Sequence, residues 1–126
     1  YDCIYIFVDL HSTLVEPNYS HTELPTTLYP EALATMQMLS QRKDCKLILY
    51  SCSYAKDLVG YFNYFSTLGI HFNYINENPE VTNSTYGSYD QKPFYNILLD
   101  DKAGFNPYKD WKLISDSFSH FNILEA

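Results

Sequence analysis

Three short apolar runs organise the chain, and each stops at a polar residue. The runs cover residues 3–8, 47–50 and 97–99, and the polar residues that follow them are Asp9, Ser51 and Asp100. An unbroken apolar run of this length predicts a strand that is buried on both faces, as in a parallel sheet, because a half-exposed strand would alternate. The sequence therefore predicts a parallel sheet at the centre of the fold.

Two helices are predicted between the first strands. Residues 30–43 place apolar side chains at helical spacing after Pro30, a residue favoured near the first helical position. The second helix begins near Ser53, a residue type favoured as N-cap, and stops at Gly69. A fourth strand is predicted over residues 70–75, directly after this helix.

The remaining segments predict loops, one helix and an edge strand. Residues 16–27 and 76–91 hold few aliphatic side chains and indicate exposed loops. A closing helix is expected from Asp110 onward, and residues 121–124 suit a last edge strand. The order of strands and helices predicts right-handed βαβ units, hence an α/β fold. We expect a three-layer Rossmann-like sandwich with a mostly parallel sheet, in a single domain over residues 1–126.

Composition narrows the classes of partner and compartment. The chain has 126 residues, 46% of them hydrophobic, which suits one folded domain rather than a disordered chain. A net charge of −7 argues against non-specific binding to nucleic acid or to anionic membranes, because both are polyanions. No apolar run is long enough to span a membrane. Three cysteines without a CxxC pair indicate reduced thiols and a cytoplasmic location.

The polar residues at the strand ends carry the candidate chemistry. In an open parallel sheet, ligands bind beyond the carboxyl ends of the strands. Asp9, Ser51 and the pair Asp100–Asp101 follow three strands, and Lys92 precedes the last of these strands. Carboxylates with few basic neighbours suit Mg²⁺. A carboxylate, a cation, a hydroxyl and an ammonium are the parts needed for phosphoryl transfer.

Four segments, in chain order, resemble the motifs of the haloacid dehalogenase-like (HAD) superfamily, whose first motif is hhhDxDGTL, with h for an apolar residue. The run from Asp100 to Ala103, followed by Trp111, is similar to small members of that superfamily that lack a cap domain. The resemblance spans residues 3 to about 113 and implies a capless HAD-like core. The matching segments are residues 6–14 (IFVDLHSTL), 47–51 (LILYS), 92–93 (KP) and 97–101 (ILLDD).

The resemblance implies a Mg²⁺-dependent phosphatase. Asp9 would attack phosphorus and form an aspartyl-phosphate, which water then hydrolyses. Ser51 would donate a hydrogen bond to the phosphoryl group, and Lys92 would neutralise its oxygens. The implied Mg²⁺ ligands are Asp9, Asp100, Asp101 and the backbone carbonyl of His11.

Position 11 departs from the family pattern, because the second motif Asp, which acts as general acid and base, is His11 here. Histidine can do this work, with an ordinary pKa of about 6.5. Mg²⁺ and Lys92 nearby should lower the pKa of His11 and favour its neutral form. His11 is either a catalytic substitute or a relic of lost catalysis. Ser12 replaces the motif glycine, at a position expected to need only a compact residue.

Each candidate residue also has an ordinary structural interpretation: Asp9 as a turn cap, Ser51 as a helix N-cap, Lys92 as a surface lysine, and Asp100–Asp101 as a solvated turn. A thiol phosphatase at Cys52 is excluded, since its Cys-x₅-Arg loop would require Arg in place of Leu58. Only four glycines are present, which argues against a P-loop or a dinucleotide-binding loop. A phosphoryl-acceptor domain like response regulators would place its acidic pair first rather than last.

Two hypotheses follow from the sequence. The first is a capless Mg²⁺-dependent phosphohydrolase that acts on a phosphorylated small molecule or macromolecule. Its site would be open to solvent unless a neighbouring subunit of a homo-oligomer covers it. The second is a catalytically impaired HAD-like module that retains Mg²⁺ or phosphate binding and serves in protein interaction.

Overall fold

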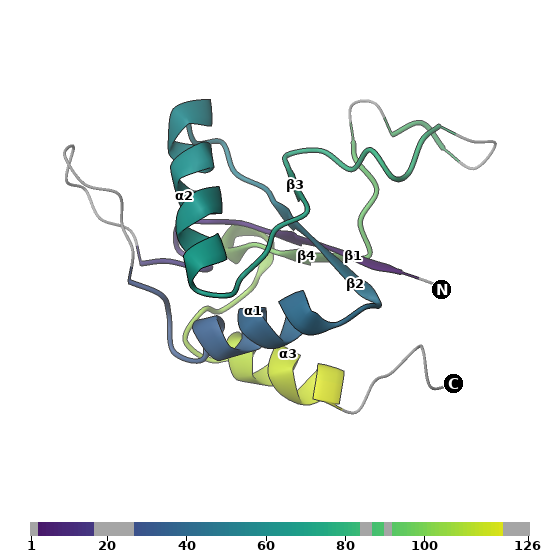
Figure 1. Ribbon diagram of the computed structural model, residues 1–126. Coiled ribbons are helices and arrows are strands. Elements are labelled where there is room, and N and C mark those ends of the chain that lie inside the picture. Colours follow the sequence, from purple (N-terminus) through teal and green to yellow (C-terminus); the bar gives the residue numbers. More distant parts are fainter. Residues whose placement is uncertain (1–2, 17–26, 84–86, 90–91, 120–126) are drawn as a thin grey trace.

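The computed structural model describes residues 3–16, 27–83, 87–89 and 92–119 (Figure 1). Helices and strands alternate along most of the chain, as the apolar pattern predicts. The elements are β1 (Ile4–Val8), α1 (Ala32–Gln41), β2 (Cys45–Leu49), α2 (Ala55–Thr67), β3 (Tyr74–Ile75), β4 (Ile97–Leu99), the short 3-10 helix η1 (Asp101–Ala103) and α3 (Asp110–Ser119).

The four strands form one sheet in the order β3-β2-β1-β4, and every neighbouring pair is parallel. This confirms the α/β fold with a parallel sheet. The register aligns the last residues of the strands in one row, since Val8 lies opposite Leu49 and Leu99, and Leu49 lies opposite Ile75. The residues that follow these four therefore leave the sheet at the same edge.

The main core lies between one face of the sheet and the helices. Ile4, Ile6 and Val8 of β1 face this core, and the residues between them face the other way. Figure 1 shows α1 and α3 side by side along the sheet. Burial of each large apolar side chain contributes about 1.5–3 kcal/mol. The helical residues in the core are Ala32, Met36, Leu39, Leu58, Tyr61, Phe65, Trp111 and Phe118.

The connection from β3 to β4 lies against the opposite face of the sheet, where Phe94 and Tyr95 contact Tyr5 and Phe7 of β1. A right-handed connection that runs back across the sheet must pass on the face away from the earlier helices. Phe7 is fully buried there, and its ring lies 5.0 Å from the ring of Tyr50 and 5.3 Å from that of Tyr95. The described part of this connection contains no helix, so aromatic side chains form the layer on this face.

The start of α2 differs from its prediction. Its N-cap is Tyr54, which makes no side-chain cap hydrogen bond, and the predicted N-cap Ser53 is wrong. The amide of Ser53 instead donates to Ser51 Oγ at 3.2 Å, and the two hydroxyls are 3.0 Å apart. The Ser53 hydroxyl, which would accept a hydrogen bond from a helix amide if Ser53 were the N-cap, is paired with Ser51 instead.

Strand β3 is shorter than predicted, with two residues in place of six. Just before β3, a side chain takes the place of one strand hydrogen bond. The backbone amide of Asn73 donates to the Leu47 carbonyl at 2.7 Å, and the side-chain oxygen Asn73 Oδ1 accepts from the Leu47 backbone amide at 2.9 Å. The loop predicted after β3 is confirmed for residues 76–83 and 87–89, which lie outside the strands and helices. Most of the predicted loop at 16–27 and the predicted strand at 121–124 lie outside the described residues.

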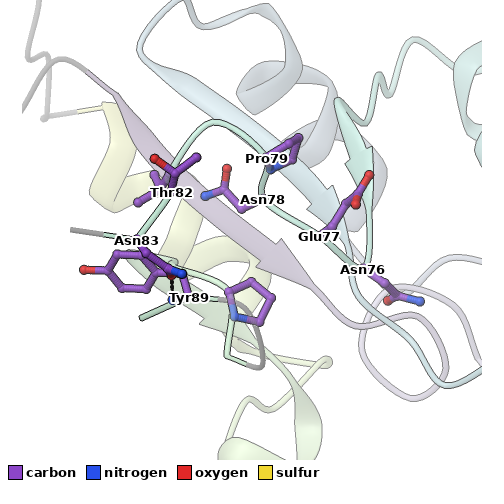
Figure 2. A pocket seen from close by; sticks show the side chains of 9 residues that line it. Asn76, Glu77, Asn78, Pro79, Thr82, Asn83 and Tyr89 are labelled. Carbon is purple, nitrogen blue, oxygen red and sulfur yellow. Dashed lines mark hydrogen bonds between the residues drawn. The ribbon is translucent and has the colours of Figure 1, made fainter. Parts of the chain in front are cut away.

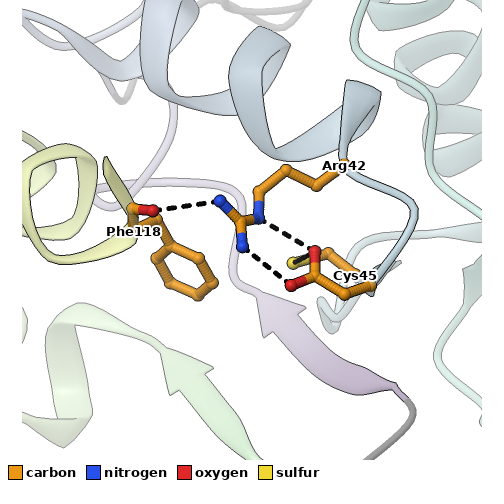
Figure 3. A network of polar contacts seen from close by, with 4 residues as sticks. Arg42, Cys45 and Phe118 are labelled. Atoms are coloured by element: carbon orange, nitrogen blue, oxygen red, sulfur yellow. Dashed lines mark hydrogen bonds and ion pairs between the residues drawn. The ribbon is translucent and has the colours of Figure 1, made fainter. Parts of the chain in front are cut away.

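An arginine fixes the end of α3 to the turn before β2 (Figure 3). Arg42 donates two hydrogen bonds to the Asp44 carboxylate, at 2.9 and 2.7 Å, and a third to the carbonyl of Phe118 at 3.0 Å. Its guanidinium also lies 5.3 Å from the centre of the Phe118 ring. This bidentate geometry matches the planar guanidinium to the carboxylate, so the buried acid is neutralised where the sheet begins.

Candidate functional site

The row of strand ends places its next residues around one cavity. The amide of Asp9 donates to the Leu99 carbonyl at 2.9 Å, and the amide of Tyr50 donates to the Val8 carbonyl at 2.9 Å, which extends the sheet by one residue. The cavity has a volume of about 720 Å³, within the range of ligand sites. It is lined by Asp9, His11, Ser12, Tyr50, Ser51, Cys52, Ser53, Asn76, Asp100, Asp101 and Lys102.

Three carboxylates meet in this cavity. Asp9, Asp100 and Asp101 each offer one oxygen, and these oxygens all lie within 4.8 Å of one another. Burial and, after it, the negative charge of Asp100 raise the pKa of Asp9 to about 6. Within the described parts of the chain, the ion pairs found join Arg42 to Asp44 and Lys112 to Asp116, away from this cluster. The cluster therefore holds negative charge that no ion pair among those residues offsets.

Thr13 joins the carboxylates and was missed by the sequence analysis. Its buried hydroxyl lies 3.1 Å from Asp9 Oδ2 and 3.4 Å from Asp101 Oδ1, and it accepts a hydrogen bond from the Asp101 amide at 2.9 Å. One hydroxyl proton serves one carboxylate at a time, so Thr13 satisfies only part of the cluster. Trp111 Nε1 donates to the Thr13 carbonyl at 2.8 Å and ties this segment to α3. One sequence feature could have pointed to Thr13, because it matches the threonine of the first HAD motif, hhhDxDGTL.

The two lysines of the region lie in different places. Lys92 is exposed and is not among the described residues that line the cavity, whereas Lys102 lines it. The chain reaches β4 from the amino end of the strand, where the Asn96 amide donates to the Tyr5 carbonyl at 2.9 Å. Lys92 precedes that point, while Lys102 directly follows the acidic pair. The geometry thus brings five of the six predicted site residues together and adds Lys102; the role of Lys92 stays a prediction.

His11 is partly buried and faces an aromatic residue of α2. Its Nε2 lies 3.5 Å from the Tyr61 hydroxyl, and the two rings meet edge to face with their centres 5.9 Å apart. Burial lowers the pKa of His11, against the opposing effect of the Asp57 charge. The direction matches the prediction, but the cause in the protein itself is burial. His11 is therefore mainly neutral near neutral pH.

Ser12 adopts a left-handed backbone, with a φ of 63°. A residue with a Cβ is strained in this conformation, and glycine is not. The expectation that position 12 needs only a compact residue is therefore incomplete, because the position also demands a positive φ. The Ser12 amide donates to the Val15 carbonyl at 2.9 Å, and this tight turn carries the chain back from the cavity.

Ser51 lies between the end of β2 and the start of α2, as an anion-binding residue would. Since Tyr54 is the N-cap of α2, Ser51 does not cap that helix. The first amides of a helix without a side-chain cap remain available to an anion, and the helix dipole favours negative charge there. The hydroxyls of Ser51 and Ser53 lie at the same point of the cavity wall. A phosphoryl group placed here would meet hydroxyl and amide donors.

A second cavity of about 460 Å³ lies under the connection from β3 to β4 (Figure 2). Asn78 is buried in its wall, donating to the Phe94 carbonyl at 2.8 Å and accepting from the Glu80 amide at 3.2 Å. Asn83 accepts a hydrogen bond from the Tyr89 amide, the dashed line in Figure 2. These amides bind the connection to itself, so they shape the loop.

Comparison with known proteins bears on the fold. No family model matches the chain, and no curated protein matches it. A solved structure of a conserved protein from Bacteroides thetaiotaomicron is similar, with a TM-score of 0.71 and 22% identity, over 98% of this chain and 95% of that one. The likeness supports the Rossmann-like α/β architecture. In the described residues, no helix has the length and apolarity needed to cross a bilayer.

Proposed function

We propose that the chain is a Mg²⁺-dependent phosphohydrolase that uses Asp9 as its nucleophile. The observation that carries the proposal is the cluster of Asp9, Asp100 and Asp101, whose oxygens lie within 4.8 Å of one another. The cluster lies in the same cavity as Ser51 and Ser53, two residues of the turn that precedes α2. Acidic and phosphate-binding groups beside each other are what phosphoryl transfer requires.

The donor set fits a hard divalent cation. Carboxylate oxygens are the ligands that Mg²⁺ prefers. The pKa of about 6 for Asp9 reflects its burial and the negative charge of Asp100, and a bound cation would offset both. Asp9, Asp100 and Asp101 would hold the ion together with the carbonyl of His11. When bound, Mg²⁺ supplies positive charge that lets a carboxylate and a phosphate dianion approach each other.

The side chains have separate tasks in this proposal. An Asp9 oxygen forms a bond to phosphorus while the ester P–O bond breaks, and the leaving oxygen takes a proton from solvent water. Ser51, Ser53 and the first amides of α2 donate hydrogen bonds to the phosphoryl oxygens. Lys102 lines the cavity and adds positive charge there, a task that the family resemblance gives to Lys92. Water then attacks the phosphorus of the aspartyl-phosphate and restores Asp9.

A mainly neutral His11 favours the second half of this reaction. Neutral imidazole accepts a proton from the attacking water, as a general base does. The same neutral ring is a poor acid, so it does not readily protonate a poor leaving group in the first half. We therefore expect aryl phosphates, whose leaving groups need little protonation, to react faster than alkyl phosphates.

The second candidate function is a binding module that retains Mg²⁺ and phosphate but turns over little. The observation that favours it is the contact of His11 with Tyr61. His11 Nε2 lies 3.5 Å from the neutral Tyr61 hydroxyl, so this ring nitrogen is directed toward α2. Substitution His11→Asp separates the candidates. A large gain of turnover would indicate that the natural protein is impaired.

Phosphate release from a generic aryl phosphate tests the proposal, with Mg²⁺ and with chelator. Asp9→Asn should lower Mg²⁺-dependent turnover by at least about 10³-fold, since it removes the nucleophile. Asp116→Asn is the matched control, because Asp116 is 60% exposed on α3 and outside the cavity. Turnover that survives chelation, or that Asp9→Asn leaves intact, would contradict the proposal.

A further inference from the structure

Asn76 makes an unusual set of contacts with the end of β2. It directly follows β3 and donates its own amide to the Leu49 carbonyl at 2.8 Å, so it continues the β2–β3 ladder by one residue. Its side chain then bonds Ser51 twice. Asn76 Oδ1 accepts from the Ser51 amide at 2.8 Å, and Asn76 Nδ2 donates to the Ser51 carbonyl at 2.9 Å. One side chain thus stands in for the next residue of a strand.

The residue type matches this task. Asn76 has a φ of 57°, in the left-handed region, where asparagine and glycine are the residues most readily accommodated. A bond to an amide and a bond to a carbonyl require an acceptor and a donor on one short side chain. The carboxamide of asparagine carries the acceptor and the donor on two separate atoms at this length, whereas aspartate lacks the donor, a serine hydroxyl has a single polar atom, and glutamine is longer by one methylene.

The contacts fix the backbone of Ser51 and leave its hydroxyl to the cavity. Both backbone groups of Ser51 are bonded to Asn76, while Ser51 Oγ lies 3.0 Å from Ser53 Oγ in the turn before α2, and both serines line the cavity. Asn76 itself lines the same cavity. A displacement of about 1 Å at a binding group can cost a large factor in rate, so the placement of Ser51 matters to any ligand held there.

We propose that Asn76 is a positioning residue: through Ser51 it sets the geometry of the phosphate subsite and hence the affinity for phosphate. This inference rests on the proposed function, because it takes Ser51 as a ligand of the phosphoryl group. Asn76 acts through Ser51 and does not itself touch the reacting atoms.

A neighbouring residue of the same type provides the control. Asn73 also bonds β2 with its backbone amide and its Oδ1 atom, but at Leu47, which points into the core and does not line the cavity. Asn73→Ala therefore removes a similar contact between the same strands without touching Ser51. A purely structural role for Asn76 would make the two substitutions equivalent.

The test combines the binding of inorganic phosphate with steady-state kinetics. Asn76→Gly keeps the left-handed backbone accessible and removes both side-chain bonds, whereas Asn76→Asp keeps the acceptor for the Ser51 amide and places a carboxylate oxygen opposite the Ser51 carbonyl. We expect both variants to weaken Mg²⁺-dependent phosphate binding about 10-fold and to raise KM for an aryl phosphate more than they lower kcat. Thermal unfolding establishes that each variant is folded at the assay temperature.

The outcomes separate this inference from the proposed function. If turnover requires Asp9 but Asn76→Gly and Asn76→Asp bind phosphate like the parent, the assignment of Asn76 fails and the phosphohydrolase stands. If Asn73→Ala weakens phosphate binding as much as Asn76→Gly, the effect is general destabilisation and the assignment also fails. If the parent binds phosphate without turnover and only the Asn76 variants lose binding, Asn76 positions the subsite of a binding module. A parent that binds no phosphate would overturn the assignment of Asn76, whereas the phosphohydrolase fails only if turnover that requires Mg²⁺ and Asp9 is also absent.

Discussion

Two acidic sites lie at opposite edges of the sheet, and their negative charge is compensated to different degrees. Asp44 precedes β2 at the amino edge, is 2% exposed, and is paired with Arg42 at 2.7 Å. Hydrogen bonding with Arg42 lowers the pKa of Asp44. At the carboxyl edge, burial and the charge of Asp100 raise the pKa of Asp9 to about 6. The fold supplies its own cation at one edge and concentrates negative charge at the other.

The difference indicates which edge is structural and which is functional. A buried carboxylate with a bidentate partner joins α3 to the turn before β2 and needs nothing further. A carboxylate cluster without such a partner destabilises the folded chain, and it persists in proteins where a ligand or a reaction uses it. In the candidate site, the carboxylates that would bind the cation therefore lower the stability of the folded chain.

The largest effect is expected at the amino edge. Arg42→Ala would leave the buried Asp44 carboxylate without its partner, so the free energy of unfolding should fall by about 3 kcal/mol. Urea unfolding monitored by tryptophan fluorescence measures this change. The double variant Arg42→Ala/Asp44→Ala should recover part of the loss, because it removes the uncompensated charge. A loss no larger than that of an exposed pair would show that the two edges do not differ as described.

The opposite sign is expected at the carboxyl edge. Asp9→Asn removes a charge that burial disfavours and Asp100 repels, so in chelator near neutral pH the free energy of unfolding should rise by on the order of 1 kcal/mol, with allowance for solvent screening. The same unfolding assay measures it. Asp116→Asn, at an exposed pair on α3, should change the value by less than about 0.5 kcal/mol. An Asp9→Asn protein less stable than the parent would contradict the electrostatic account.

The two edges of the sheet should also respond to pH in opposite ways. A carboxyl group whose pKa is raised on folding, as that of Asp9 is, binds more protons in the folded state, so its contribution destabilises progressively as pH rises from about 4 to about 6. The stability difference between Asp9→Asn and the parent should be small at the acidic end of this window and reach its full size above it. Asp44 behaves in reverse, because its pKa is lowered and its stabilising contribution is lost as pH falls. Melting temperatures of the parent and of Asp9→Asn across the window measure this, and a constant difference would refute it.

The smallest effect concerns backbone strain beside the carboxylates. Ser12 has a φ of 63°, so Ser12→Gly should be more stable than Ser12→Ala by roughly 0.5 kcal/mol, because glycine avoids the Cβ strain and loses part of that gain to chain entropy. The two variants differ only at this Cβ, and chemical unfolding compares them. An alanine variant at least as stable as the glycine variant would show that the turn is not strained.

Much of the fold could be predicted from the sequence because buried parallel strands leave a simple pattern. The unbroken runs before Asp9 and Asp100 are strands in the structure, and their register brings both acids to one edge. The helices follow from apolar spacing. The short length of β3 could not be predicted. Its apolar pattern indicates backbone pairing with β2 from residue 70 onward, but at Asn73 the side chain accepts the hydrogen bond that a strand carbonyl would accept.

The candidate site was predictable where residues directly follow strands and less so elsewhere. The placement of Lys102 rather than Lys92 in the cavity wall depends on the path of a long connection, which local sequence does not encode. Thr13 and Asn76 act through hydrogen bonds to residues distant in the chain, and nothing in their neighbourhoods marks those partners. Such contacts depend on tertiary structure, so they emerge only when the strands are aligned.

Calorimetric titration of Mg²⁺ into the parent protein and into Asp9→Asn tests whether the carboxylate cluster is a cation site. We expect saturable binding to the parent, weaker near pH 6 than at higher pH because the ion displaces a proton from Asp9. Binding to Asp9→Asn should be at least about tenfold weaker. Asp116→Asn should bind like the parent. Equal binding by the parent and Asp9→Asn, or no binding by the parent at any pH, would contradict the account.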